Sequence, residues 1–186
     1  TCHAVSTVLT VFFVGLALGS WAFGQLIDRR GTSGLRWYAV LELGVGLYAF
    51  ATPWLFDAIQ RVYLPLYQAS GFAPWALVGA SFACAAAILL IPTILLGGTF
   101  PVLSRFIVRS GAERGEKIAG LYWINTAGAM AGTLFVYYAG LPVLGLFRTL
   151  LCAGVLNLGI GLFCLILDRE LILPSAGSDG AEQAAD

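Results

Sequence analysis

Residues 91–133, IPTILLGGTFPVLSRFIVRSGAERGEKIAGLYWINTAGAMAGT, contain the pattern that decides the fold. Two apolar runs flank a loop that holds the densest cluster of cationic side chains in the chain, Arg105, Arg109, Arg114 and Lys117. An apolar run of about 20 residues is long enough to cross a bilayer as a helix, and a cationic loop after it tends to stay in the cytoplasm. The stretch therefore predicts a membrane protein.

The composition supports this class and excludes several others. Of the 186 residues, 59% are hydrophobic and only 11% are charged, whereas a soluble domain carries about 25% charged residues. Ten cations balance ten anions, so no net positive charge attracts nucleic acid. With one histidine, His3, and four cysteines without CxxC spacing, the sequence offers no local metal site and no Ser-His-Asp triad. We expect no cofactor and no metal.

Apolar runs predict an all-α polytopic transmembrane bundle of five spans, followed by a disordered polar tail. The spans are predicted at residues 4–27, 35–56, 74–104, 118–141 and 143–167, all in one domain of residues 1–170, with the tail at 171–186. Pro92 and Pro101 each remove a backbone donor, so the third span should be kinked. The short connection at 141–147 makes the last two spans an antiparallel hairpin.

The cations between the spans predict their orientation. The loops at 28–36 and 105–117 hold three and four Lys or Arg residues, whereas those at 57–73 and 141–148 hold one each. By the positive-inside rule, the cation-rich loops and the C-terminal tail are expected in the cytoplasm, and Thr1 outside.

Four motifs follow one another along the chain: GLALGSWAFGQLIDRRG at 15–31, YAVLELGVGLYA at 38–49, PTILLGGTFPVLSRF at 92–106 and GLYWINTAGAMAGTLF at 120–135. In this order and spacing they resemble the membrane half of bacterial fused transporter–spermidine synthases, a spermidine synthase-like and major-facilitator-like family. The resemblance implies half of a major-facilitator-like bundle in the bacterial inner membrane. It also implies a transport-related role for a small molecule, with a polyamine as one candidate.

Two parts of that family's usual architecture have no counterpart in this sequence. Members usually open with one more helix, which carries a Tyr-Glu pair, ahead of the stretch that matches Thr1–Ala4. Many continue into a cytoplasmic aminopropyltransferase-like domain with a Gly-rich nucleotide loop. Because no residue here matches that domain, no catalytic residue can be carried over, and we expect no enzyme activity from this chain. A longer gene product could carry such a domain.

Glu42 is the only acidic side chain inside a predicted span. A charged side chain at mid-bilayer costs about 2.5–3.5 kcal/mol, so Glu42 should face the bundle, within reach of the fourth span. It lies about 9 Å from the Arg36 end of its helix, close to the depth of Tyr122 and Asn125. With Asn157 these residues form a candidate intramembrane polar site. It has two open interpretations, a substrate or proton site and plain interhelical hydrogen bonding.

Glycine pairs in GxxxG spacing mark two spans for close helix contact. Gly15 and Gly19 lie on the first span, and Gly128 and Gly132 lie on the fourth. Such faces suit packing within the chain or against other membrane helices, in a homodimer or a larger complex.

The first loop carries a second candidate motif, formed by Gly24, Asp28, Arg29, Arg30 and Gly31. It resembles the cytoplasmic loop signature of the major facilitator superfamily. Its charges serve either as topology determinants at the membrane edge or as a latch between transport states.

Two classes of function follow. The first is a transport-related module that moves or senses a small molecule, and Glu42 could neutralise a cationic substrate. The second is a non-transporting membrane anchor or assembly subunit for an enzyme or an electron-transfer complex, which needs only the glycine faces.

Overall fold

The computed structural model describes residues 2–30, 33–69, 74–107 and 114–172. Nearly all of them are helical, in the order α1 (Cys2–Arg30), α2 (Gly34–Ala69), α3 (Pro74–Ile107), α4 (Arg114–Phe135), the π-helix η1 (Val136–Leu144) and α5 (Gly145–Ile172). The all-α prediction is confirmed for this part of the chain. The tail predicted at 171–186 lies outside the described residues apart from its first two, which end α5.

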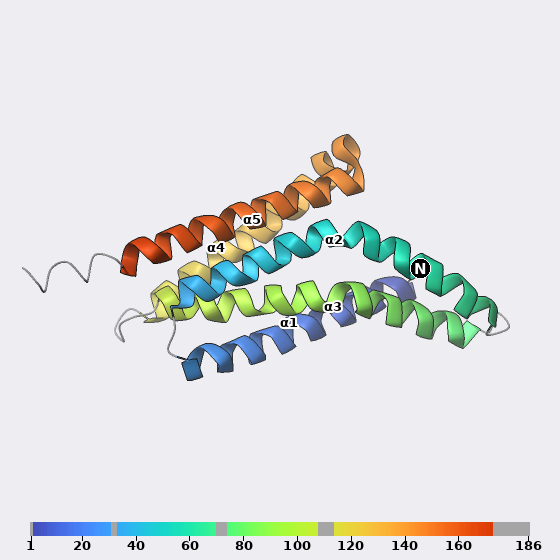
Figure 1. Cartoon of the computed structure of the whole chain (residues 1–186), viewed down its shortest axis with the longest axis horizontal. Coiled ribbons are helices and arrows are strands. Elements are labelled where there is room, and N and C mark those ends of the chain that lie inside the picture. Colours follow the sequence, from blue (N-terminus) through green and yellow to red (C-terminus); the bar gives the residue numbers. More distant parts are fainter. Residues whose placement is uncertain (1, 31–32, 70–73, 108–113, 173–186) are drawn as a thin grey trace, which may run out of the picture.

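Four helical stretches in the described ranges are long and apolar enough to cross a membrane, so the predicted count of five spans is not matched. The difference arises because α4, η1 and α5 follow one another without a non-helical residue, as a 56-residue stretch from Gly115 to Glu170. The chain reverses within this stretch, at η1, so α4 and α5 run in opposite directions (Figure 1). Gly145 permits the reversal because its φ of 75° lies in the left-handed region, which side chains disfavour.

The most extensive helix contact joins α1 and α3, and it depends on glycine. A Cβ on Gly19 would overlap the carbonyl oxygen of Ile94, and a Cβ on Gly97 would overlap that of Leu16. Gly15 likewise lies against the Thr93 side chain. Without side chains at these positions the two backbones approach closely, which is how small residues join helices in lipid.

A second pair, α2 with α5, is packed in the same way. A Cβ on Gly46 would lie 2.9 Å from the carbonyl oxygen of Gly154, and one on Gly161 would lie 2.9 Å from that of Ala39. Ala39 is fully buried in this contact. The α2·α3 contact then joins the two pairs, giving the order α1, α3, α2, α5 across the bundle (Figure 1).

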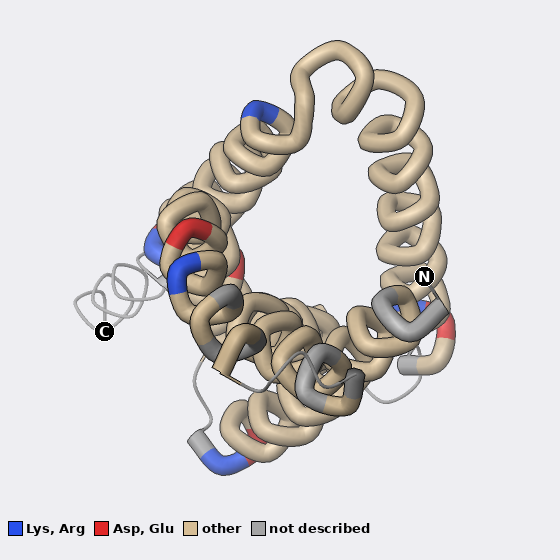
Figure 2. The backbone as a smooth tube through the Cα atoms, turned by 90° about the vertical axis from the view of Figure 1, so that its right-hand side faces the viewer, with Lys and Arg blue, Asp and Glu red and all other residues tan. Residues whose placement is uncertain are grey.

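The helix α4 stands apart from this bundle. Seen along the long axis, α4 and α5 leave η1 as two diverging arms of an arch (Figure 2). Nearly all described side chains of α4 are exposed, and its contact with α3 is near one end, where the rings of Tyr122 and Phe100 meet edge to face at 6.2 Å. A Cβ on Gly128 or Gly132 would meet no atom within 4 Å. The helix contact predicted for this glycine pair is therefore not made by any of the described residues.

The third span contains no break at the position of the predicted kink. The helix α3 continues unbroken from Pro74 to Ile107, through Pro92 and Pro101. One reason that the helix continues through Pro92 lies at Ile88. Because Pro92 has no N–H, the Ile88 carbonyl lacks its usual helical donor. That carbonyl instead accepts a hydrogen bond from the Tyr48 hydroxyl at 2.7 Å. The clearest change of direction in Figure 1 is in α2, near its middle.

Candidate functional site

A cavity of about 630 Å³ lies where α2, α3 and α5 meet. It is lined by Val45, Tyr48, Ala49, Thr52, Pro53, Phe56, Asp57 and Gln60 of α2, by Ile88, Leu89 and Pro92 of α3, and by Leu146, Phe147, Leu150, Ala153 and Asn157 of α5. Binding sites for small organic molecules usually have volumes of about 300–1,000 Å³ and mostly apolar walls with a few polar groups. The cavity, which we call the α2–α3–α5 pocket, fits that description.

Proline residues of two helices line the α2–α3–α5 pocket. Pro53 has no N–H to donate to the carbonyl of Ala49, one turn earlier, and it lies close to the bend of α2. Pro92 occupies the facing part of α3. The pocket lies beside this bend, between α2 and the facing parts of α3 and α5.

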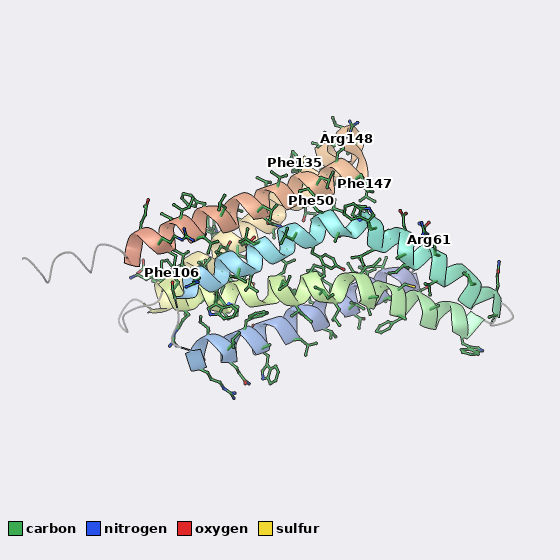
Figure 3. All side chains as sticks on the ribbon, viewed as in Figure 1. Phe50, Arg61, Phe106, Phe135, Phe147 and Arg148 are labelled. Carbon is green, nitrogen blue, oxygen red and sulfur yellow. The ribbon has the colours of Figure 1, made fainter. Side chains whose placement is uncertain are left out.

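Tyr48 and Thr52 line the pocket with hydroxyls that already donate to backbone carbonyls, and the other polar side chains lie toward its two ends. Asp57 and Gln60 are exposed, and they are the last of the α2 residues that line the pocket. Phe147, which follows η1, also lines the pocket (Figure 3). Asn157 is half-buried at the other end, and its amide makes no hydrogen bond within the described residues. Between them Thr52 is buried, and its hydroxyl donates to the Tyr48 carbonyl at 2.9 Å. Because Asp57 and Gln60 are exposed polar residues, we call their end the mouth of the pocket. The middle is mostly apolar, and Asn157 lies at the other end.

Glu42 lies one turn beyond the pocket toward the end of the bundle where α1 ends and α2 begins, which we call the cation-rich end. It is buried, with 7% of its surface exposed. The Tyr38 hydroxyl, one turn earlier on α2, donates a hydrogen bond to its carboxylate. Across the α2·α5 contact it lies near Cys164. Glu42 thus faces the bundle, as expected.

The structure does not bring Glu42 to the fourth span. Asn125 is exposed on α4, and 63% of the surface of Tyr122 is exposed. The reason is that the small residues of α2 bring it against α5, while α4 is held away by η1. Of the four residues predicted as one polar site, Glu42 and Asn157 lie on the α2·α5 contact and the two others lie elsewhere.

Two polar contacts hold helix pairs together at the cation-rich end. Arg105 of α3 donates to the carboxylate of Asp28 of α1 at 2.8 Å, in an ion pair with both side chains more than half exposed. Ser33, just before α2, donates a hydrogen bond to the buried carboxylate of Asp168 on α5. The first contact ties α1 to α3, and the second ties α2 to α5.

Only part of the predicted loop motif takes part in these contacts. Asp28 forms the ion pair, and Gly24 lies near Pro101 of α3, where a Cβ would be 4.0 Å away. Arg29 is exposed, whereas the Arg30 side chain and Gly31 lie outside the described residues.

Sequence reasoning missed three functional candidates. The sequence predicts a connection at 57–73, which contains Asp57 and Gln60, whereas α2 continues through both residues. Asp168 follows the last apolar run, and the spacing of residues before it does indicate which helix face it belongs to. It continues the row of Asn157, Gly161 and Cys164 at spacings of three and four, which places all four residues on one face of a helix.

The comparisons identify no relative. No family model, no curated protein and no solved structure matches the chain. Within the described residues, no group of three or more His, Cys, Asp or Glu side chains could hold a metal ion.

Proposed function

We propose that the chain is a transport-related module of the bacterial inner membrane that binds a small molecule in the α2–α3–α5 pocket. One observation carries the proposal, a cavity of about 630 Å³ between α2, α3 and α5. The helices α2 and α3 are each apolar enough to cross a membrane, and α5 belongs to a longer stretch that is. A helix bundle that served only as an anchor would need no such space, because interiors are normally close-packed.

The depth of the pocket supports this proposal. The cation-rich end faces the cytoplasm in our proposal, as the positive-inside rule requires. Asp57 follows Arg36 by 21 residues, which corresponds to about 32 Å of helix, close to the thickness of the hydrocarbon core. Asp57 then lies at the opposite surface of the membrane. The pocket extends inward from that surface to Asn157.

The two helix pairs, α1·α3 and α2·α5, are arranged so that one pair can move against the other. The pair α1·α3 and the pair α2·α5 each have a glycine-mediated contact and a polar contact at the cation-rich end. The pocket is lined from both pairs, so rocking one pair against the other would change its width. Rigid-body motion of this kind is a common basis of alternating access. The exposed Asp28–Arg105 pair contributes only about 0–1 kcal/mol, so it can break during such a motion.

Filling the pocket should abolish function. We expect Ala153→Phe, which adds a ring to the wall of the pocket, to reduce solute-evoked charge movement at least tenfold in proteoliposomes on a solid-supported membrane. The solutes are a panel of cations that ranges from single-chain amines to spermidine. The matched control, Ala83→Phe, alters an exposed α3 side chain that does not line the pocket, and it should keep the wild-type signal. The proposal is contradicted if no solute evokes a current that Ala153→Phe removes.

A specific observation also favours the second candidate, an assembly subunit. The exposed helix α4 carries Asn125, Gly128 and Gly132 where no other part of the described chain packs on them. An amide facing lipid is unfavourable, and another membrane helix would supply a partner for it. In this alternative α4 carries the contact with a second copy or a larger complex. The substitution Ala153→Phe would then leave the assembly unchanged.

A further inference from the structure

We infer that the α2–α3–α5 pocket binds an amphipathic monocation, with its apolar body between the three helices and its cationic head beside Asp57. The inference rests on the proposed function, because it names the class of ligand for the same pocket. It uses three properties of the pocket: its walls, the charge at its mouth and the depth of that mouth in the membrane.

The walls select an apolar body. Apart from Asp57, the side chains that line the pocket are uncharged, and most are aliphatic or aromatic. Of the polar ones, Tyr48 and Thr52 already donate to backbone carbonyls. Burying a polar chain here would leave its donors and acceptors without partners, which is unfavourable in a low-dielectric interior. An alkyl or aryl body has no such cost.

The mouth selects a single positive charge. Asp57 is the one charged residue that lines the pocket, and its carboxylate makes no ion pair within the described residues. Gln60, less than one turn further along α2, adds an amide oxygen that can accept from an ammonium group. At the surface of the membrane the head stays partly hydrated, as charged heads of amphipathic molecules do.

The same features exclude other ligand classes. An anionic head would meet the Asp57 carboxylate and be repelled. A phospholipid would bring its phosphate to the same place. A polyamine carries several charges along its length, and the pocket has no second carboxylate to pair with them. Glu42 cannot serve, because it does not line the pocket and already accepts from Tyr38.

Two photoprobes with one diazirine-bearing alkyl chain test the inference. One ends in trimethylammonium and the other in a neutral hydroxyl group. Each is crosslinked to the protein in nanodiscs of zwitterionic lipid, and labelled residues are mapped by mass spectrometry. We expect the cationic probe to label pocket residues at a concentration at least tenfold lower than the neutral probe.

The variant Asp57→Asn should remove that difference, and Asp57→Glu should restore it. The control Glu116→Gln, an exposed carboxylate of α4, should change neither value.

The contrary results distinguish a wrong ligand class from a pocket that binds no small molecule. If both probes label the pocket equally well and Asp57→Asn changes nothing, the cationic class is wrong while the pocket remains a binding site. If neither probe labels the pocket, the inference and the proposed function both fail. If phosphatidylethanolamine in the nanodisc displaces the cationic probe, the occupant is a membrane lipid and the inference is overturned.

Discussion

Replacing Gly19 by Ala should lower the free energy of unfolding by about 1–3 kcal/mol. The added Cβ would overlap the backbone carbonyl oxygen of Ile94, and a backbone atom cannot move aside as a flexible side chain can. The helices α1 and α3 would have to separate along the contact that also includes Gly15 and Gly97. Reversible unfolding of the monomeric protein in detergent, followed by circular dichroism, measures the change.

Gly128→Ala is the matched control, with the opposite sign expected. The same chemical change on α4 meets no atom within 4 Å, and alanine favours a helix over glycine by about 0.8–1 kcal/mol. Gly128→Ala should therefore leave the monomer as stable as before or slightly more so. Equal destabilisation by both substitutions would contradict the packing described for α1 and α4. Loss of stability in Gly128→Ala only where the protein is oligomeric would instead favour the assembly subunit.

Glu42→Leu should destabilise the protein by about 1–3 kcal/mol, because it leaves the Tyr38 hydroxyl without an acceptor in a site that water does not reach. Removing both polar groups, in the double variant Tyr38→Phe with Glu42→Leu, should recover most of that loss. Glu42→Gln should change stability little, since the amide oxygen still accepts from Tyr38. A double-mutant cycle of unfolding free energies measures the coupling.

The Gln variant also separates the two interpretations of Glu42. If the carboxyl has only a structural role, Glu42→Gln should retain the solute-evoked currents. If it carries a proton or contacts the substrate during transport, the currents should disappear while the unfolding free energy stays unchanged. A Glu42→Leu variant as stable as wild type would show that Tyr38 and Glu42 do not depend on each other.

Local features of the sequence predicted much of the fold. Long apolar runs located the helices, and the Gly15–Gly19 spacing lies where α1 meets α3. The end of α2 was predicted 13 residues too early, at 56 instead of Ala69. A polar segment ends an apolar run, but it does not end a helix, because outside the hydrocarbon core helix formation no longer requires apolar side chains.

The partner of α4 could not be predicted from its own residues. The spacing of Asn125, Gly128 and Gly132 indicates a face suited to contact, but it carries no information on which helix will cover it. That choice depended on η1, whose π-helical geometry through Pro142 holds the two arms apart. No short-range pattern indicates such a geometry. The similar depths of Glu42, Tyr122 and Asn125 along their helices therefore predicted the wrong neighbour for Glu42.

The pocket was only partly predictable. Asn157 stood out because an amide is rare among apolar residues. Asp57 did not, because a charge just beyond an apolar run is what any membrane helix shows. Its significance comes from the continuation of α2 and from the cavity beside Pro53, and both depend on how three helices meet.

We expect the α2–α3–α5 pocket to be open to small molecules from the Asp57 side. Single cysteines at Leu150, Ala153 and Leu156, each in a protein without its native cysteines, test it through their rates of reaction with a small cationic methanethiosulfonate reagent. The first two positions line the pocket, and Leu156 is an exposed position of α5 outside it. We predict that both pocket cysteines react at least tenfold faster than Leu156→Cys, and that Ala153→Phe slows the reaction at position 150. Equal, slow reaction at all three positions would contradict the account.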